Sequence, residues 1–463
     1  MSGAFDVERW QTSSSLALSD GAGQTWTWSE WCPRVLGLAG RLKREWPRRD
    51  VTVAVALDAQ RSADSALLAT ALLRADVPFA LLHPRWTGEQ RKQRLEELGR
   101  PPVIGCDDLP ALESSTPHRL PPTVDDDRPA VTVFTSGSTG SPKAAVLSRR
   151  ALAASARASE ANLGWVDGDR WLLSMPLAHV GGLSIVTRCA AAGTGVVVDP
   201  SASFDPASMV ELCEREAVTL LSVVPTMLHR LLDLPEWGLG GLRAILVGGA
   251  AAPVALVRRA VRRKLPVLLT YGLTESCSQV ATQSVARLVD PDRCFDVGTP
   301  LRGTEICVAD GPLRVRGATL FSGYLGPDGA LYGGPEADGW WTTSDLGSVD
   351  GVGRLQILGR ADDVIITGGE NVHPFVVEEA LRERSSVADA CVFGLPDDEW
   401  GQKVAALVVL VEGASVDDLE RSLEEDLASF QRPRLLRAVD ALPTNAQGKV
   451  DREACRRVAV GQA

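Results

Sequence analysis

The feature that most constrains the fold is an alternation of strand-like and helix-like segments in the middle of the chain. Between residues 129 and 310, short runs rich in Val, Ile and Leu alternate with segments of helical periodicity. We expect strands over residues 130–134, 171–175, 218–224, 243–248 and 266–271. A helix is expected over 148–163, with Ser148 as its candidate N-cap. This alternation predicts an α/β fold with mostly parallel sheets and crossover helices, in which ligands bind at the carboxyl ends of strands.

The pattern changes twice towards the C-terminus. Turns rich in Gly and Pro become dense between residues 311 and 353, which predicts a β-rich module. Beyond it we expect a small α+β domain with strands over 389–394, 404–411 and 435–439 and an amphipathic helix over 416–430. The sequence therefore predicts a large N-terminal domain over 1–361 and a small domain over 362–463, the latter of a normal domain size.

Composition excludes several functional classes. The net charge is −11 and no basic run with interleaved aromatic residues occurs, so we expect no nucleic-acid partner. The apolar stretch 66–82 is interrupted by Arg74 and Asp76, which argues against membrane insertion. The N-terminus has acidic residues where a secretory signal would be apolar, and the nine cysteines include no C-x-x-C pair. Both features are typical of a cytoplasmic protein with reduced thiols.

A polar loop directly follows the expected strand 130–134. Residues 135–143 read TSGSTGSPK, which does not fit the phosphate-loop pattern G-x-x-x-x-G-K-[ST]. Its hydroxyls, flexible glycines and single ammonium nevertheless suit a polyphosphate, although Gly, Ser, Thr and Pro also gather in solvated surface loops. The candidate phosphate-binding residues are Thr135, Ser136, Gly137, Ser138, Thr139, Gly140 and Lys143.

Lysine is scarce in this chain, which has 42 Arg and 6 Lys. Arginine cannot replace a compact ammonium that makes a point contact, so a lysine in a polar loop is informative here. Lys143 and Lys449 each follow a segment rich in Gly, Ser, Thr or Asn. We therefore regard both as candidates for contact with an anion.

Three further segments carry groups suited to a nucleotide. In TYGLTES (270–276), Tyr271 can stack on a base. The hydroxyl of Thr274 can bond a phosphate, and the carboxylate of Glu275 can hold Mg²⁺. The alternatives are a core tyrosine and a carboxylate that caps a helix. In WTTSDLG (341–347), Asp345 can accept from ribose hydroxyls or form an Asx turn. The segment GRADD (359–363) places Arg360 beside two acids.

Together with the segment around Lys449, these motifs resemble, in order and separation, the signatures of the adenylate-forming superfamily. This superfamily comprises acyl-CoA synthetases, luciferases and peptide-synthetase adenylation domains, and the match covers residues 130–452. The resemblance implies that a small carboxylic acid attacks the α-phosphate of ATP, which gives an acyl-adenylate and pyrophosphate. The acyl group then passes to the thiol of coenzyme A, and Mg²⁺ assists. Charge neutralisation and alignment dominate such catalysis.

The resemblance also implies individual roles. The residues expected to act in catalysis or to hold ATP, besides the loop 135–143, are Lys449, Thr274, Glu275 (also the metal ligand), His179, Gly248, Gly249, Ala250, Tyr271, Gly272, Asp345 and Arg360. The small domain is expected to be mobile and to rotate about a hinge at Asp362. That rotation would bring Gly368 and Gly369 to the coenzyme A tunnel.

Within the superfamily, several segments are similar to the o-succinylbenzoate–CoA ligases of menaquinone biosynthesis. They are residues 175–188, 248–253, 274–279, 368–374 and 396–402. This similarity implies that His179, Arg188 and Ser222 contact the acyl substrate, with Arg188 on the carboxylate that is not activated. Arg188 could equally reach back to solvent, and His179 could be a packed core residue. Those ligases commonly have an aromatic residue where Ala178 stands, so the acyl pocket is expected to differ.

The sequence leaves alternatives open. The chain could be another aryl- or acyl-CoA ligase, or a stand-alone adenylation domain that loads a carrier protein. A relative that only binds nucleotide is disfavoured, because both motif lysines are retained in a chain biased towards Arg. Homo-oligomer formation is also left open.

Overall fold

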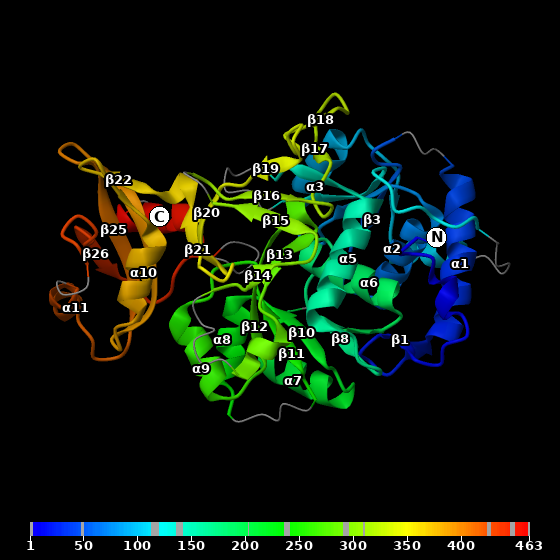
Figure 1. The fold of residues 1–463 in the computed structure, drawn as a ribbon, viewed down its shortest axis with the longest axis horizontal. Helices are drawn as coiled ribbons and strands as arrows, with labels where there is room; N and C mark the ends of the chain where they lie inside the picture. Colours follow the sequence, from blue (N-terminus) through cyan, green and yellow to red (C-terminus); the bar gives the residue numbers. More distant parts are fainter. Residues whose placement is uncertain are drawn as a thin grey trace.

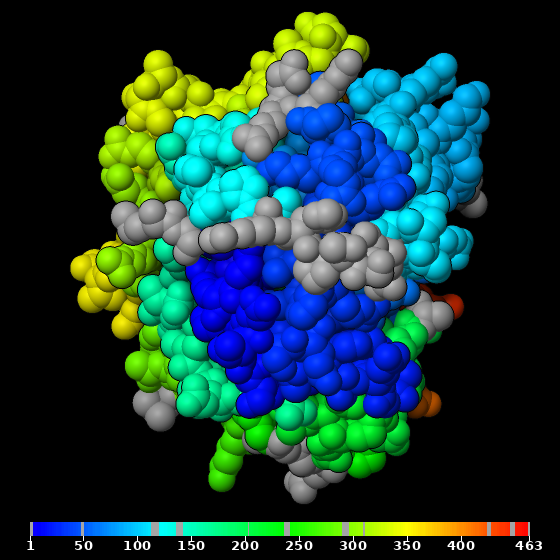
Figure 2. Space-filling view, turned by 90° about the vertical axis from the view of Figure 1, so that its right-hand side faces the viewer, coloured from blue at the N-terminus to red at the C-terminus, as the bar shows by residue number. Residues whose placement is uncertain are grey.

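The computed structural model describes residues 3–47, 51–112, 120–135, 142–201, 203–235, 241–289, 296–308, 311–423, 427–444 and 450–461. Figure 1 shows a large N-terminal body (blue to yellow) with a smaller C-terminal body (orange to red) beside it. Figure 2 views the molecule from the end opposite the small body, and this face is formed mainly by N-terminal segments in blue and cyan. The prediction of a large N-terminal domain followed by a smaller C-terminal domain is therefore confirmed.

One large sheet has the strand order β14-β13-β12-β11-β10-β8-β9-β1-β2. Its strands are β1 (Leu16–Ser19), β2 (Thr25–Thr27), β8 (Arg170–Leu173), β9 (Gly195–Val198), β10 (Leu220–Val223), β11 (Ala244–Val247), β12 (Val267–Leu273), β13 (Ser278–Thr282) and β14 (Thr299–Pro300). The central pairs from β12 to β1 are parallel, whereas β13, β14 and β2 pair antiparallel at the two edges. The parallel centre confirms the prediction made from the alternating segments.

A second large sheet has the order β18-β17-β7-β6-β4-β3-β5. Its strands are β3 (Val55–Asp58), β4 (Phe79–Leu82), β5 (Val103–Ile104), β6 (Pro129–Phe134), β7 (Ala144–Ser148), β17 (Gly323–Leu325) and β18 (Leu331–Tyr332). Strands β5, β3, β4 and β6 are mutually parallel. Strand β7 instead returns antiparallel to β6, so the polar loop 135–143 joins two neighbouring strands before the first helix of this region begins.

Helices fill the space between the large sheets and cover their outer faces. They are α1 (Trp28–Glu45), α2 (Ala63–Ala75), α3 (Gly88–Glu97), α4 (Leu109–Leu112), α5 (Arg149–Leu163), α6 (Val180–Ala192), α7 (Pro206–Arg215), α8 (Pro225–Asp233) and α9 (Val254–Arg262). Apolar residues of α1, α2, α5 and α6 share one core with both sheets, while α7, α8 and α9 pack on the far side of the first sheet. Helix α5 begins as expected, because Ser148 Oγ accepts from the Ala151 amide at 3.1 Å.

Two small antiparallel sheets connect the large sheets to the C-terminal body. Strands β15 (Thr304–Cys307), β16 (Arg314–Gly317) and β19 (Trp340–Thr342) form one, and β20 (Asp345–Val349) and β21 (Leu355–Arg360) form the other. Leu313, Val315 and Leu355 pack in one core with Tyr271 of β12. This confirms the β-rich module and brings it against the end of β12.

The C-terminal body is a mixed sheet with helices on both faces. Its elements are β22 (Ile365–Thr367), β23 (Glu370–Val372), α10 (Pro374–Arg382), β24 (Val387–Asp397), β25 (Gly401–Leu410), α11 (Val416–Ser422), β26 (Leu435–Ala438) and α12 (Arg452–Ala459). Alternate residues of β24 and β25 enter two cores, one shared with α10 and α11 and the other with α12. The helix expected over 416–430 ends at Ser422, where the hydroxyl donates back to the Leu419 carbonyl and competes with helix continuation.

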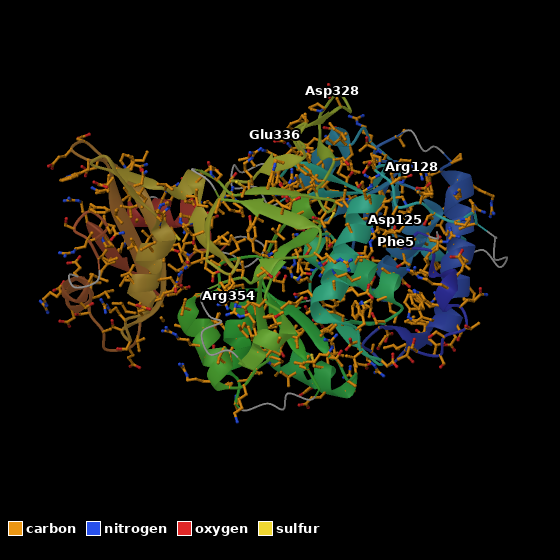
Figure 3. All side chains as sticks on the ribbon, viewed as in Figure 1. Phe5, Asp125, Arg128, Asp328, Glu336 and Arg354 are labelled. Carbon is orange, nitrogen blue, oxygen red and sulfur yellow. The ribbon has the colours of Figure 1, made fainter. Side chains whose placement is uncertain are left out.

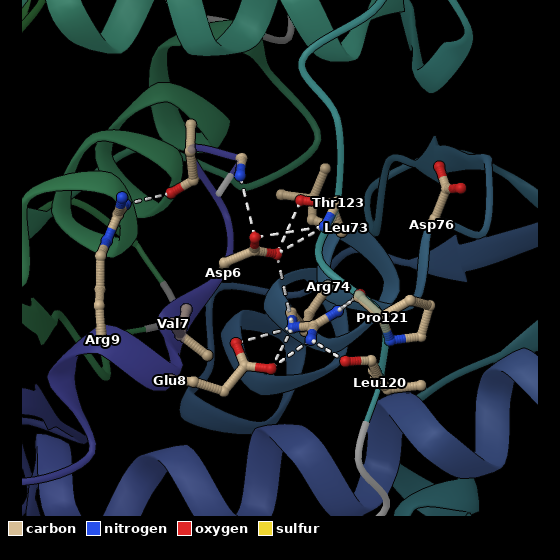
Figure 4. Close-up of polar contacts among 12 residues, drawn as sticks. Asp6, Val7, Glu8, Arg9, Leu73, Arg74, Asp76, Leu120, Pro121 and Thr123 are labelled. Atoms are coloured by element: carbon tan, nitrogen blue, oxygen red, sulfur yellow. Dashed lines mark hydrogen bonds and ion pairs between the residues drawn. The ribbon is translucent and has the colours of Figure 1, made fainter. Parts of the chain in front are cut away.

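The N-terminal segment, which carried no recognisable motif, is fastened to the large domain by a buried polar network (Figure 4). The Arg74 side chain is 1% exposed, and its Nε donates to both carboxylate oxygens of Glu8 at 2.9 Å. Asp6 accepts from the amide and the hydroxyl of Thr123, at 3.0 and 2.8 Å. Buried charges with this many partners hold the 3-10 helix η1 (Val7–Trp10) against α2.

Candidate active site

The two ends of the polar loop lie side by side. The Thr135 amide donates to the Lys143 carbonyl at 2.8 Å, and the Lys143 amide donates to Thr135 Oγ1 at 3.2 Å. These bonds extend the pairing of Phe134 with Ala144 by one step beyond the ends of β6 and β7. Of the predicted phosphate-binding residues, Ser136, Gly137, Ser138, Thr139 and Gly140 lie outside the described residues.

Glu275 lies in a one-turn 3-10 helix, η3 (Thr274–Ser276), directly after β12. Its Oε1 accepts a hydrogen bond of 2.6 Å from the phenol of Tyr324, and the Lys143 Nζ lies 5.1 Å from the centre of the Tyr324 ring. Burial and the neighbouring carboxylate raise the pKa of the Tyr324 phenol well above its ordinary value, so it stays a donor. The structure thus groups two predicted residues through a third that sequence analysis missed, since an isolated Tyr in a Gly-rich segment carries no distinguishing signal.

Glu275 fits a magnesium ion. The described residues contain no cluster of three or more His, Cys, Asp or Glu side chains that could cage a metal. Mg²⁺ does not require such a cage, because it commonly binds one or two carboxylates together with nucleotide phosphates. The hydrogen bond from Tyr324 uses Oε1 of Glu275, and a carboxylate offers a second oxygen of the hard type that Mg²⁺ prefers.

Three of the predicted nucleotide residues are also brought together. The Tyr271 hydroxyl donates to Asp345 Oδ2 at 2.6 Å, and Arg360 Nη1 lies 3.7 Å from Asp345 Oδ1. Asp345 and Arg360 are direct partners in the β20–β21 pair. Burial and the Asp345 carboxylate raise the pKa of Tyr271 well above its ordinary value. Tyr271 is therefore a core residue, as in the alternative interpretation of its sequence, and its hydroxyl bonds to a second predicted nucleotide residue.

Two of the glycines near these residues are required by close packing of the backbone. Gly248, Gly249 and Ala250 follow β11, the parallel neighbour of β12. A Cβ at Gly248 would lie 2.7 Å from Thr270 Cγ2, and one at Gly272 would lie 1.5 Å from the Ser278 carbonyl oxygen. Neither position has room for a side chain, independently of any ligand.

Arg188 of α6 does not reach solvent, because it is only 2% exposed. Its guanidinium carbon lies 5.6 Å from the centre of the Trp171 ring, and Trp171 Nε1 donates to Ser222 Oγ at 3.0 Å. Nε and Nη2 of Arg188 have no hydrogen-bond partner among the described residues. Burial lowers its pKa to about 10, which leaves it charged at neutral pH. A buried cation with unpaired donors is costly unless an anion binds there.

His179 is the N-cap residue of α6. Its ring centre lies 4.9 Å from that of His83, which follows β4 and was not singled out from the sequence. Burial and Arg85 lower the pKa of His83, which favours a neutral imidazole. Ala178 is buried in the core between the large sheets, and His179 itself is half-buried.

The remaining predicted residues belong to the domain junction and the small domain. Asp362 is exposed in the 3-10 helix η5 (Ala361–Asp363). Gly368 and Gly369 form the β22–β23 turn with φ of +58° and +86°, and a Cβ at Gly368 would lie 2.5 Å from the Trp400 ring. The structure thus places Gly368 against Trp400 of the small domain, whose carbonyl accepts from the Gly368 amide at 2.9 Å. Lys449 lies outside the described residues.

Comparison with known proteins identifies the class to which this geometry belongs. The AMP-binding enzyme family matches residues 7–325, and the AMP-binding enzyme C-terminal domain matches residues 376–449. The 2-succinylbenzoate–CoA ligase of Bacillus pumilus is 31% identical over 453 residues, which cover 92% of each chain. That of Listeria monocytogenes is 32% identical over 444 residues, 93% of this chain and 94% of its own.

Solved structures agree with these matches. The o-succinylbenzoate CoA synthetase of Bacillus subtilis, in complex with its acyl-adenylate intermediate, superimposes with a TM-score of 0.85 at 29% identity and 98% coverage of both chains. The same enzyme has been solved with ATP and a magnesium ion. ATP-bound MatB from Rhodopseudomonas palustris has a TM-score of 0.87 at 26% identity and 99% coverage of both chains. The chain therefore belongs to the AMP-binding enzyme family, as the resemblance of its motifs implied.

Proposed function

We propose that this protein is an ATP-dependent acid–thiol ligase that converts 2-succinylbenzoate to its coenzyme A thioester in menaquinone biosynthesis. The observation that carries the substrate assignment is the buried guanidinium of Arg188 with its unpaired Nε and Nη2. A substrate with two carboxylates needs a cation for the one that is not activated. The kinship with 2-succinylbenzoate–CoA ligases supports this choice over other aryl or acyl acids.

The acyl pocket would be formed around α6. Arg188 would bind the ring carboxylate, and the face of the Trp171 ring would hold the Arg188 guanidinium in place. Ser222 accepts a hydrogen bond from the indole nitrogen of the same Trp171. His179 at the start of the same helix would contact the succinyl end, where the carboxylate is activated. A guanidinium that is already desolvated binds a carboxylate strongly, because little hydration is lost on binding.

ATP would bind where the ends of β6 and β12 meet the β-rich module. Asp345 and Arg360 would hold the ribose, and Tyr271 would face the adenine beside Gly248, Gly249, Ala250 and Gly272. Lys143, the loop 135–141 and Thr274 would bind the phosphates. Glu275 would hold Mg²⁺, which supplies charge neutralisation for the polyphosphate when it is bound.

The small domain would complete the site. We place the domain boundary between residues 361 and 362 and the hinge at Asp362 in η5. Lys449 would stabilise the developing charge in adenylate formation, and rotation of the domain would then bring Gly368 and Gly369 to the thioester site. These assignments rest on the resemblance of residues 359–363 and of the segment around Lys449 to the family's motifs.

We also propose that the enzyme works in the cytoplasm. Among the described cysteines, eight are free thiols, in accord with a reducing compartment. Within the described ranges, no helix is long and apolar enough to span a bilayer.

The deciding experiment measures pyrophosphate release and acyl-CoA formation across a panel of aryl and alkyl acids. We expect the highest kcat/KM for 2-succinylbenzoate, with thioester formed from coenzyme A. Preference for a monocarboxylic acid would instead identify another acyl-CoA ligase. Adenylate that forms but is never transferred to coenzyme A would favour the loading of a carrier protein.

A further inference from the structure

Tyr324 connects two segments of the candidate nucleotide site that are far apart in the sequence. Its hydroxyl donates to Glu275 Oε1 at 2.6 Å, and its ring centre lies 5.1 Å from the Lys143 ammonium. We propose that Tyr324 is a positioning residue for adenylate formation: its hydroxyl orients the Glu275 carboxylate towards the metal, and its ring holds Lys143 beside that carboxylate. This inference rests on the proposed function in one respect, which is that Glu275 binds Mg²⁺.

The backbone around Tyr324 is bonded to both segments. In the β17–β7 pair, Tyr324 lies opposite Ala145, two residues beyond Lys143. On the other side, the Phe321 amide donates to the Glu275 carbonyl at 2.8 Å. Strand β7 and the η3 turn are therefore both bonded to residues 321–324, which fixes the position of the Tyr324 backbone.

The direction of the side chain is fixed by aromatic packing. The Tyr324 ring meets Phe321 edge-on, with centres 4.8 Å apart, and lies 5.6 Å from the ring of Tyr332 in β18. The turn that joins β17 to β18 is marked by Asp328 in Figure 3. Tyr324 is 9% exposed, so its hydroxyl has few positions available besides the one against Glu275.

In this arrangement one side chain contacts two groups of opposite charge, the Glu275 carboxylate through its hydroxyl and the Lys143 ammonium through its ring. The phenol O–H makes a charge-assisted hydrogen bond to the carboxylate, and the electron-rich ring face attracts the ammonium. A direct ion pair between Lys143 and Glu275 would neutralise both groups before ATP and the metal arrive. Contact through Tyr324 instead keeps the cation available for phosphate and a carboxylate oxygen available for Mg²⁺.

The test removes the hydroxyl alone and measures metal binding directly. Tyr324→Phe keeps the ring contacts, and Tyr332→Phe is the matched control that removes a neighbouring phenol from the same aromatic cluster. Mn²⁺ affinity is measured by electron paramagnetic resonance with a non-hydrolysable ATP analogue, and AMP affinity is measured in EDTA. We expect Tyr324→Phe to weaken Mn²⁺ binding about tenfold, as for the loss of one charge-assisted hydrogen bond. AMP binding and Tm should stay at the parent values, and Tyr332→Phe should change none of the three.

Two further variants separate positioning from simple packing. In a Glu275→Gln background, Tyr324→Phe should have no additional effect on Mn²⁺ affinity, because the oriented carboxylate is already absent. Tyr324→Leu should weaken metal-free binding of the ATP analogue as well, because Lys143 then loses the ring face. Unchanged Mn²⁺ affinity in Tyr324→Phe, additive effects in the double variant, or an equal loss of AMP binding in EDTA would each overturn the inference.

The experiment distinguishes failure of the role proposed for Tyr324 from failure of the proposed substrate. A parent enzyme that binds Mn²⁺ with nucleotide, but prefers an acid other than 2-succinylbenzoate, removes the proposed substrate and leaves the role of Tyr324 intact. A parent enzyme that binds no Mn²⁺ with nucleotide overturns the role of Tyr324 itself.

Discussion

The phenol oxygen of Tyr271 lies 2.6 Å from Oδ2 of Asp345, although 74 residues separate the two in the chain. Tyr271 comes from β12 of the parallel sheet and Asp345 from β20 of the β-rich module. The bond joins the two parts of the large domain at the position where we place the nucleoside of ATP. A buried carboxylate held by a phenol keeps one orientation, so ribose hydroxyls would meet an acceptor that is already in place.

Tyr271→Phe should therefore weaken the binding of ATP without changing the binding of the carboxylic acid substrate. We expect the KM for ATP to rise about tenfold, because a hydrogen bond to a charged group is lost. The KM for 2-succinylbenzoate should change little. Steady-state kinetics with each substrate varied in turn provide the measurement, and an equal rise in both KM values would contradict a role confined to the nucleotide.

Arg188→Lys should raise the KM of the acid. Lysine keeps the charge but lacks the planar fork and the stacking surface that suit a carboxylate next to Trp171. A loss of ~1.5–3 kcal/mol predicts an increase of about tenfold or more. The parent and the variant are to be compared on 2-succinylbenzoate and on an analogue without the ring carboxylate, with Arg157→Lys on the exposed face of α5 as control. If Arg188→Lys raises the KM of both acids equally, Arg188 does not bind the ring carboxylate.

Lys449→Ala should separate the two half-reactions. An aligned charge in adenylate formation is worth ~3 kcal/mol, so pyrophosphate release should fall by about 10²-fold. Thioester formation from supplied acyl-adenylate should be much less affected, because in the proposed function the lysine would act before the small domain rotates. Lys92→Ala, at an exposed position of α3, is the control. Equal losses in both half-reactions would contradict the rotation.

Asp362→Pro should block the second half-reaction selectively. Proline fixes φ and so restricts the backbone change that a hinge requires. Adenylate formation should persist while turnover to the thioester is lost, as measured by separate assays of pyrophosphate and acyl-CoA. Turnover close to that of the parent would exclude position 362 as the pivot.

Gly272→Ala should destabilise the large domain. A Cβ there would lie 1.5 Å from the Ser278 carbonyl oxygen, so β12 and β13 would have to separate. Overpacking of this kind typically costs ~1–3 kcal/mol, and more where backbone must move. Gly88→Ala, where a Cβ meets nothing within 4 Å, should leave Tm at or above the parent value. Thermal unfolding of both variants checks this prediction.

The sequence by itself determined the fold class and the order of the site segments. The strands expected near 130–134, 218–224, 243–248 and 266–271 are present as β6, β10, β11 and β12, because short β-branched runs between helical segments have few other arrangements. Local chemistry also identified the start of α5, since an N-cap acts within three residues of its own position. The five ordered motifs were sufficient to identify the family, which the comparisons confirm.

Only the tertiary structure decided which side chains meet. Hydroxyl, carboxylate and ammonium groups come from segments many residues apart, and no local pattern encodes the distance between them. The contact of Tyr324 with Glu275 and the pair His83–His179 depend on how the two large sheets are placed against each other. The contact of Arg188 with Trp171 depends on how helix α6 packs on strand β8. Burial is equally non-local: the sequence allowed Arg188 to reach back to solvent, and the packing of α6 between the two large sheets buries it instead.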